Sequence, residues 1–267
     1  MDYQKELRTA VLAAQKAGQY LISQRNQIRI TTYKGSRHNY ATRQDLTSEK
    51  MIMRILHKNF PHDLILSEET SPAEQAERIW IVDPIDGTRN YANQFPYFSV
   101  SIALWENGQS RVGVVYAPGF NHELYSAVRG RGAWLNGKNL RKINPAQPLA
   151  SSLIATGHGY FKGKVLRGLF KTHRAVADRC LDLLRLSSAS LDICQVAAGR
   201  LGGYFETGLK PWDIAAAILI LKEQRGIVTN YTGKKANLFA QKNKQFSIEL
   251  LACKNKKIHR ELSRILS

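Results

Sequence analysis

The spacing of apolar and polar residues along the chain predicts a succession of helices and short strands. Apolar residues recur at helical spacing over residues 2–26, so a long amphipathic helix is expected there. Residues 28–33 alternate and are rich in β-branched side chains, which predicts a strand, and 34–43 is expected to be a polar loop. Residues 72–77 are expected to form a helical turn or a surface loop. Further helices are expected at 45–59, 162–177, 188–199, 211–225 and 255–266, and further strands at 64–66, 79–82, 98–105, 111–116, 123–128, 152–155, 182–186, 202–206, 227–230 and 247–252.

One stretch, Trp80 to Asn90, combines a strand with chemically active side chains. Pro84 is expected to end the apolar strand, which leaves Asp83 at its last position. The turn Asp86-Gly87-Thr88 then leads into a short helix, which Asp86 can cap while the next two amides point outward. Two carboxylates three residues apart, beside bare amides at a helix start, suit a cation and a phosphate held side by side.

The plainer interpretation is that this stretch only ends a strand and caps a helix, because Asp, Pro and Gly are the usual turn residues. Two other stretches change that balance. Leu66 to Glu69 places two acids after a strand, and Lys210 to Asp213 places an acid at the start of a helix. Three separate stretches of this kind favour one composite site.

Composition is typical of a globular protein, with 43% hydrophobic and 22% charged residues in 267. No apolar run approaches the ~20 residues that a membrane-spanning helix needs, and the first residues lack the apolar centre of a signal peptide. Cys180, Cys194 and Cys253 are far apart and form no Cys-x-x-Cys pair. We expect buried, reduced thiols and a cytoplasmic location.

The net charge of +18 is concentrated at the two ends of the chain. Residues 1–44 carry eight Lys and Arg against two acids, and residues 234–267 carry nine against two. Such a surface attracts nucleic acid, anionic membranes or phosphorylated substrates. Because no nucleic-acid-binding motif accompanies the charge, we expect only weak, non-specific nucleic-acid binding and no membrane partner.

The chain resembles the inositol monophosphatase family of Mg²⁺-dependent, lithium-sensitive phosphatases over nearly its whole length. The motifs that carry the resemblance follow one another in family order: Thr42-Arg43-Gln44-Asp45, Ser67-Glu68-Glu69, Trp80 to Tyr91, Gly130 to Gly137, Val196 to Arg200 and Pro211 to Ala217. The resemblance implies an α/β fold, the layered α-β-α-β-α sugar-phosphatase architecture with mixed sheets, and a homodimer. It implies a single domain over 1–267, which allows a metal and phosphate side at 1–150 and a substrate side at 151–267.

The resemblance also implies a metal site built from hard oxygen ligands. Glu68, Asp83 and the Ile85 carbonyl would hold one Mg²⁺ ion. Asp83, Asp86 and Asp213 would hold a second, with Asp83 bridging, and a third, weaker ion would lie near Glu68. Ions held in this way neutralise the phosphate, acidify water and stabilise the leaving oxygen.

Water activation and substrate binding are assigned by the same resemblance. Thr88 and Asp45 would form a proton-accepting pair that orients the water, with Glu68 close by, so these three are the catalytic candidates. The substrate-binding candidates are Asp86, Gly87, Thr88, Ala189, Glu206 and Asp213.

The expected reaction is the hydrolysis of myo-inositol 1-phosphate or a similar small monoester, because Asn90 matches the inositol monophosphatase branch. Alternatives are a 3′(2′),5′-bisphosphonucleotide or fructose-1,6-bisphosphate phosphatase, or a regulatory RNA- or protein-binding member that uses the basic ends. The chain departs from the family pattern at Arg89, Asn39, Ala41 and Ser187, which stand for threonine, aspartate, valine and glycine. The roles of Lys34, Arg89 and Arg185 stay open.

Overall fold

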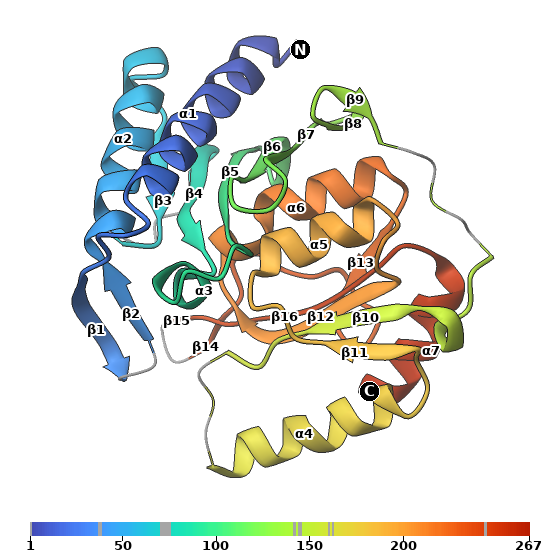
Figure 1. Ribbon diagram of the computed structural model, residues 1–267. Helices are drawn as coiled ribbons and strands as arrows, with labels where there is room; N and C mark the ends of the chain where they lie inside the picture. Colours follow the sequence, from blue (N-terminus) through green and yellow to red (C-terminus); the bar gives the residue numbers. More distant parts are fainter. Residues whose placement is uncertain are drawn as a thin grey trace.

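Helices and sheets alternate in five layers, as the family resemblance implied (Figure 1). The computed structural model describes residues 2–36, 39–69, 76–140, 143, 146–159, 161, 163–242 and 245–267. Helices α1 (Gln4–Ser23) and α2 (Arg43–Asn59) cover one face of the larger sheet, and α5 (Ala189–Ala197) and α6 (Pro211–Glu223) lie between the two sheets. Helices α4 (Gly163–Ala177) and α7 (Lys256–Leu266) cover the outer face of the smaller sheet. The layered α/β prediction is confirmed.

The larger sheet has seven strands within the described residues, in the order β3-β4-β5-β6-β7-β8-β9. Only β3 and β4 are parallel, and the remaining neighbours form an antiparallel meander. The strands are β3 (Leu64–Ser67), β4 (Arg78–Asp86), β5 (Ser99–Glu106), β6 (Gln109–Ala117), β7 (Glu123–Val128), β8 (Gly132–Leu135) and β9 (Lys138–Asn139).

The smaller sheet has five strands in the described part of the chain, in the order β11-β10-β12-β16-β13. Strand β10 is parallel to both its neighbours, whereas β16 is antiparallel to β12 and β13. The strands are β10 (Leu153–Thr156), β11 (Asp182–Leu184), β12 (Gly203–Leu209), β13 (Ile227–Thr229) and β16 (Ile248–Cys253), and a short 3-10 turn (Leu149–Ser151) precedes β10.

Two small hairpins were not expected from the sequence. Strand β1 (Ile30–Ser36) overlaps the strand predicted at 28–33, but it runs on and pairs with β2 (Asn39–Thr42), so most of the predicted loop at 34–43 is wrong. Strands β14 (Gln241–Lys242) and β15 (Gln245–Phe246) form the other hairpin. The sequences of β2, β14 and β15 are short and show little hydrophobic alternation, so the pairing of their backbones decides these strands. Most of the segment predicted at 72–77 lies outside the described residues.

Strand β4 corrects a further prediction, because it continues through Pro84 to Asp86. The ladder between β4 and β5 is irregular between Asp83 and Asp86, so the proline lies where the register shifts. A proline needs no ladder donor at such an irregularity, and the strand therefore bends there without ending.

Helix α6 is pressed against the larger sheet, and this contact sets the position of its first turn. A Cβ atom on Gly113 of β6 would lie 2.6 Å from the Ala216 carbonyl oxygen, so a larger residue at 113 would push the helix away. Ala215 and Ala217 are also buried at this contact. Small residues on both sides bring the helix, and the acid in its first turn, close to the sheet.

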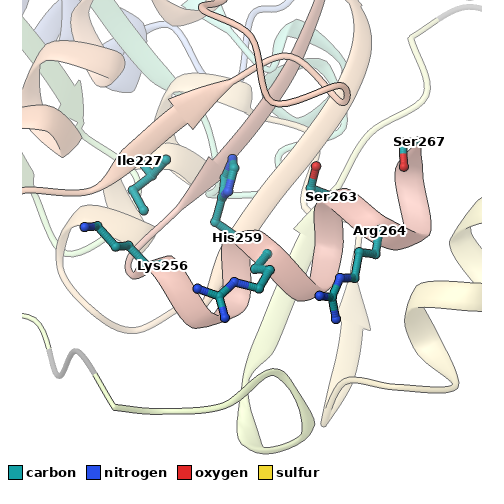
Figure 2. A pocket seen from close by; sticks show the side chains of 7 residues that line it. Ile227, Lys256, His259, Ser263, Arg264 and Ser267 are labelled. Atoms are coloured by element: carbon teal, nitrogen blue, oxygen red, sulfur yellow. The ribbon is translucent and has the colours of Figure 1, made fainter.

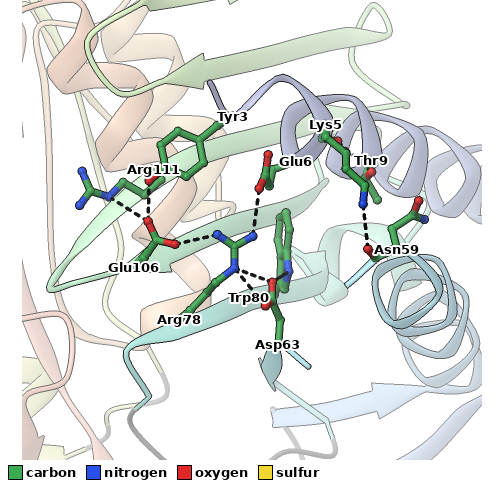
Figure 3. Close-up of polar contacts among 10 residues, drawn as sticks. All are labelled: Tyr3, Lys5, Glu6, Thr9, Asn59, Asp63, Arg78, Trp80, Glu106 and Arg111. Atoms are coloured by element: carbon green, nitrogen blue, oxygen red, sulfur yellow. Dashed lines mark hydrogen bonds and ion pairs between the residues drawn. The ribbon is translucent and has the colours of Figure 1, made fainter. Parts of the chain in front are cut away.

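A network of charged residues fixes the start of β4, at the opposite end of this strand from Asp86 (Figure 3). The Arg78 guanidinium contacts Glu6 of α1 at 3.0 Å, Asp63 at 2.9 Å and Glu106 of β5 at 2.7 Å. Tyr3 donates a hydrogen bond to Glu106. The network ties α1 to the sheet, and it explains why a central strand begins with a charged residue.

All three cysteines are free, with Cys194 and Cys253 buried and Cys180 partly exposed. Among the described residues, no helix combines the length and the apolar character that crossing a bilayer requires.

Candidate active site

Three carboxylates come together from two elements that are distant in sequence. Asp83 and Asp86 lie at the carboxyl end of β4, and Asp213 lies in the first turn of α6. The Ile85 amide donates to Asp83 Oδ1 at 3.0 Å, and the Lys210 amide donates to Asp213 Oδ2 at 2.7 Å. These backbone contacts orient both side chains and leave carboxylate lone pairs available.

Burial raises the pKa of Asp83 well above its usual range, and the nearby charges of Glu68, Asp86 and Asp213 raise it further. Burial also raises the pKa of Asp213 well above its usual range, with Asp86 and Glu68 adding to the effect. No ion pair within the described residues joins a Lys or Arg to Asp83, Asp86 or Asp213. The centre therefore holds crowded negative charge that a bound cation would stabilise.

Asp86 is held by the start of α5, and the prediction that it caps the short helix α3 (Thr88–Ala92) is wrong. Its Oδ2 accepts hydrogen bonds from Ser188 Oγ at 2.8 Å, Ser190 N at 2.7 Å and Ser190 Oγ at 2.6 Å. The Ala189 amide donates to Oδ1 at 3.3 Å. Burial raises the pKa of Asp86, and these donors oppose the rise by stabilising the ionised form.

Gly87 takes the N-cap position of α3 with a left-handed backbone, at φ 94°. The left-handed backbone favours glycine, and a Cβ atom there would lie tightly against backbone, 3.2 Å from the Ser187 carbonyl oxygen and 3.3 Å from that of Tyr97. Asn90 holds the same two segments together, because its Nδ2 donates to Tyr97 O at 2.6 Å and to Leu186 O at 2.7 Å. The turn is thus fixed against the loop before α5.

Thr88 and Asp45 lie at hydrogen-bonding distance. Thr88 Oγ1 is 3.0 Å from Asp45 Oδ1 and 3.0 Å from the Ile85 carbonyl oxygen, so its single proton has two acceptors. Asp45 Oδ2 accepts from the Thr42 amide at 2.7 Å and from the Thr42 hydroxyl, in a capping box at the start of α2. Burial raises the pKa of Asp45 to about 6, although the Thr42 and Thr88 hydrogen bonds oppose the rise.

Glu206 lies on β12 and faces a loop that is shaped around it. Gly159 N donates to Glu206 Oε1 at 2.9 Å, and the Tyr204 hydroxyl donates to the other oxygen. A Cβ atom on Gly157 would lie 2.0 Å from Glu206 Oε2, so the loop needs glycine there. In the described part of the chain no ion pair involves Glu206, which speaks against a surface salt bridge.

Glu68 is partly buried just after β3, and its charge raises the pKa of Asp45, Asp83 and Asp213. Even so, no three carboxylate, imidazole or thiol groups in the described residues are already gathered at the spacing of a bound metal ion. A bound cation would attract the ionised carboxylates and draw them together. The side chains of Lys34 and Asn39 lie outside the described residues.

Sequence reasoning missed the serines that hold Asp86. Ser190 is 104 residues away from Asp86 in the chain, and no local motif links the two positions. Thr42 could have been found, because Thr-x-x-Asp ahead of a helix is a capping-box signature.

The layered fold and the acid-rich centre together define a phosphatase scaffold with mixed sheets. A model of the Inositol monophosphatase family matches residues 2–266. The chain belongs to the inositol monophosphatase family.

Several relatives show the same relationship. A Pasteurella multocida protein named Nus factor SuhB is 40% identical over 231 residues, which cover 85% of each chain. The solved extragenic suppressor protein suhB from Bartonella henselae is 34% identical, with a TM-score of 0.88 over 99% of both chains. An IMPase from Thermotoga maritima is 31% identical, with a TM-score of 0.87 over 98% of this chain and 97% of that chain.

Proposed function

We propose that this chain is a Mg²⁺-dependent phosphoric monoester hydrolase whose leading substrate is myo-inositol 1-phosphate. The observation that carries the proposal is the Thr88–Asp45 hydrogen bond of 3.0 Å beside the crowded carboxylates of β4 and α6. A strand terminator or helix cap needs no such pair and gains nothing from crowded negative charge.

The donor set fits hard divalent cations, because carboxylate and carbonyl oxygens are the ligands that Mg²⁺ takes. Glu68, Asp83 and the Ile85 carbonyl would hold one ion, and Asp83, Asp86 and Asp213 a second. When bound, the ions supply charge neutralisation for the phosphate and lower the pKa of water.

The chain's own residues then orient the water and hold its proton. Thr88 Oγ1 donates to Asp45, which leaves hydroxyl lone pairs that can accept a hydrogen bond from the attacking water. Asp45 is fully buried and its pKa is about 6, so it can take up a proton near neutral pH. Glu68, whose charge raises the pKa of Asp45, is proposed to assist. The amides of Gly87 and Thr88 are proposed to bind phosphate oxygens.

Glu206 and Ala189 are proposed to contact the hydroxyls of the polyol. Each Glu206 oxygen already accepts one hydrogen bond from the protein and can accept another, which suits a pair of neighbouring hydroxyls. Burial raises the pKa of Glu206, whereas the Tyr204 and Gly159 hydrogen bonds favour its ionised form.

The test is a turnover panel with Mg²⁺ that compares phosphorylated polyols, 3′(2′),5′-bisphosphonucleotides and fructose 1,6-bisphosphate. Inositol 1-phosphate should have the highest kcat/KM. A higher value for either bisphosphate would move the assignment to that alternative, and no turnover on any ester would refute the enzymatic proposal. We also propose that the chain forms a homodimer and is located in the cytoplasm.

A second function is proposed from a different observation, the names of the curated relatives. The 37–40% identical relatives are named Nus factor SuhB, which supports a regulatory, transcription-linked role more directly than it supports any substrate. The net charge of +18 is compatible with an RNA partner. Asp83→Asn separates the two functions, because it should abolish turnover, and complementation by this variant in cells would assign the biological role to regulation.

A further inference from the structure

The outer helix α7 presents a row of cations that the fold does not use. Ile258 and Leu262 are fully buried in the core under the smaller sheet, so the opposite side of the helix must face solvent. Lys256, Arg260 and Arg264 lie there at four-residue spacing and are exposed. None of the ion pairs formed by the described residues involves these three.

These cations line a recess of about 410 Å³ between α7 and the start of β13 (Figure 2). Among the described residues, no acidic side chain lines this recess. His259 Nε2 lies 2.8 Å from Thr229 Oγ1, and Ser263 Oγ donates to Tyr231 O at 3.0 Å, so the polar inner residues hold the helix in place. The recess is therefore a fixed, positively charged surface feature.

The placement of the lysines costs helix stability. Lys256 and Lys257 occupy the first turn of α7, which has no acid. A cation at this end opposes the helix dipole. A purely structural helix gains nothing from this arrangement, whereas a surface that binds anions does.

The basic surface continues onto α4, which packs against α7. The two helices and the turn after α4 carry nine exposed Lys and Arg, and the same segments carry only Asp178 and Glu261 as acids. The nine are Lys164, Arg167, Lys171, Arg174, Arg179, Lys256, Lys257, Arg260 and Arg264.

We propose that α7 and α4 form a binding surface for the phosphate backbone of nucleic acid, centred on Lys256, Arg260 and Arg264. The row repeats at about 6 Å along the helix, which suits a polymer with regularly spaced charges. Of the described residues that line the recess, only Ile227 is apolar, so a peptide would find few of the anchors that stabilise protein interfaces. Membrane insertion is disfavoured because the apolar face of α7 is already buried in the core.

Binding of nucleic acid at this surface does not require phosphatase activity. The inference rests on the second proposed function, the regulatory role, and names the part of the molecule that would carry it. The test compares two triple variants. The α7 variant combines Lys256→Gln, Arg260→Gln and Arg264→Gln. The matched variant combines Arg8→Gln, Lys16→Gln and Lys50→Gln, and it removes equal charge from exposed positions on α1 and α2. The affinities for a fluorescein-labelled single-stranded RNA and for a single-stranded DNA of equal length are measured as functions of salt concentration. Melting temperature and phosphatase turnover check that each variant is folded.

Each phosphate contact contributes about 0.7 to the slope of log K against log salt for a single strand. The α7 variant should therefore lower the slope by about 2 on both RNA and DNA, while the matched variant changes it little and turnover is kept in both. Each single α7 substitution should lower it by about 0.7, which keeps the test decisive if the triple variant folds poorly. The proposal would be overturned if the two triple variants lowered the salt slope equally, or if the wild-type chain did not bind RNA. It would also be overturned if poly-glutamate displaced the RNA as readily as polyadenylate.

Discussion

Ser190→Ala tests whether Asp86 is a metal ligand through a residue that touches no metal itself. Ser190 Oγ donates to Asp86 Oδ2 at 2.6 Å and also lies 2.8 Å from Ser99 Oγ. Ser190 and Ser99 are both fully buried. Alanine is smaller than serine, so it fits in either position without strain. The substitution removes one of four donors to Asp86 and keeps the Ser190 amide in place.

The magnitude follows from the hydrogen bond. A bond to a charged acceptor contributes about 1.5–3 kcal/mol, and the three remaining donors favour the lower end of this range. Losing it destabilises ionised Asp86 relative to the protonated form. Because Mg²⁺ binds the ionised form, about 1.5 kcal/mol should appear as a roughly tenfold weaker affinity for Mg²⁺.

The assay is calorimetric titration of the metal-free protein with Mg²⁺, together with the Mg²⁺ concentration at half-maximal turnover. At saturating Mg²⁺ the kcat should be close to the wild-type value. Ser99→Ala is the control, because the Ser99 hydroxyl lies within hydrogen-bonding distance of Ser188 and Ser190, and within the described residues it makes no hydrogen bond to the Asp86 carboxylate. Equal weakening by the two substitutions, or none by Ser190→Ala, would refute the reasoning.

Four other substitutions test the remaining parts of the site. Asp83→Asn should lower kcat by more than the ~10–100-fold that a lost outer-shell partner costs, and Mg²⁺ titration of turnover checks this. In EDTA the same variant should have a higher melting temperature than wild type, and the difference should grow as pH rises above about 4. The reason is that the pKa of Asp83 is raised in the folded chain, so its ionisation favours the unfolded chain. A difference in melting temperature that shrinks as pH rises would contradict this. Thr88→Val should lower kcat by about 10²-fold or more with little change in KM, and a change in KM alone would leave Thr88 only a binding role. Glu206→Gln should impair turnover of inositol 1-phosphate by about tenfold and spare a small ester without ring hydroxyls, whereas equal losses on both would remove Glu206 from substrate recognition. Ser187→Gly should raise the melting temperature by about 1–3 °C, because Ser187 has φ 64°, and a fall would show that its side chain matters more than its backbone.

Much of the fold could be predicted from the sequence because local periodicity decides it. The apolar stripe of α1 follows from neighbouring residues, and the predicted positions of α1 and β7 were close to those observed. The acids of the candidate site could also be selected in advance, because Asp83, Asp86 and Asp213 each belong to a motif whose spacing is visible in the chain. Periodicity failed where the backbone decides pairing, as in β2, which was expected to be loop and pairs with β1.

Only the tertiary structure decided what surrounds these acids. The serines that hold Asp86 lie more than 100 residues away, and the crowding that raises the pKa of Asp83 comes from three other segments. Pro84 lies inside a strand because a neighbouring strand tolerates a register shift there. The cations of α7 form a surface only because Ile258 and Leu262 on the other side are buried. Sequence patterns report what each residue prefers locally, whereas hydrogen bonds, burial and electrostatics between distant segments exist only once the chain has folded.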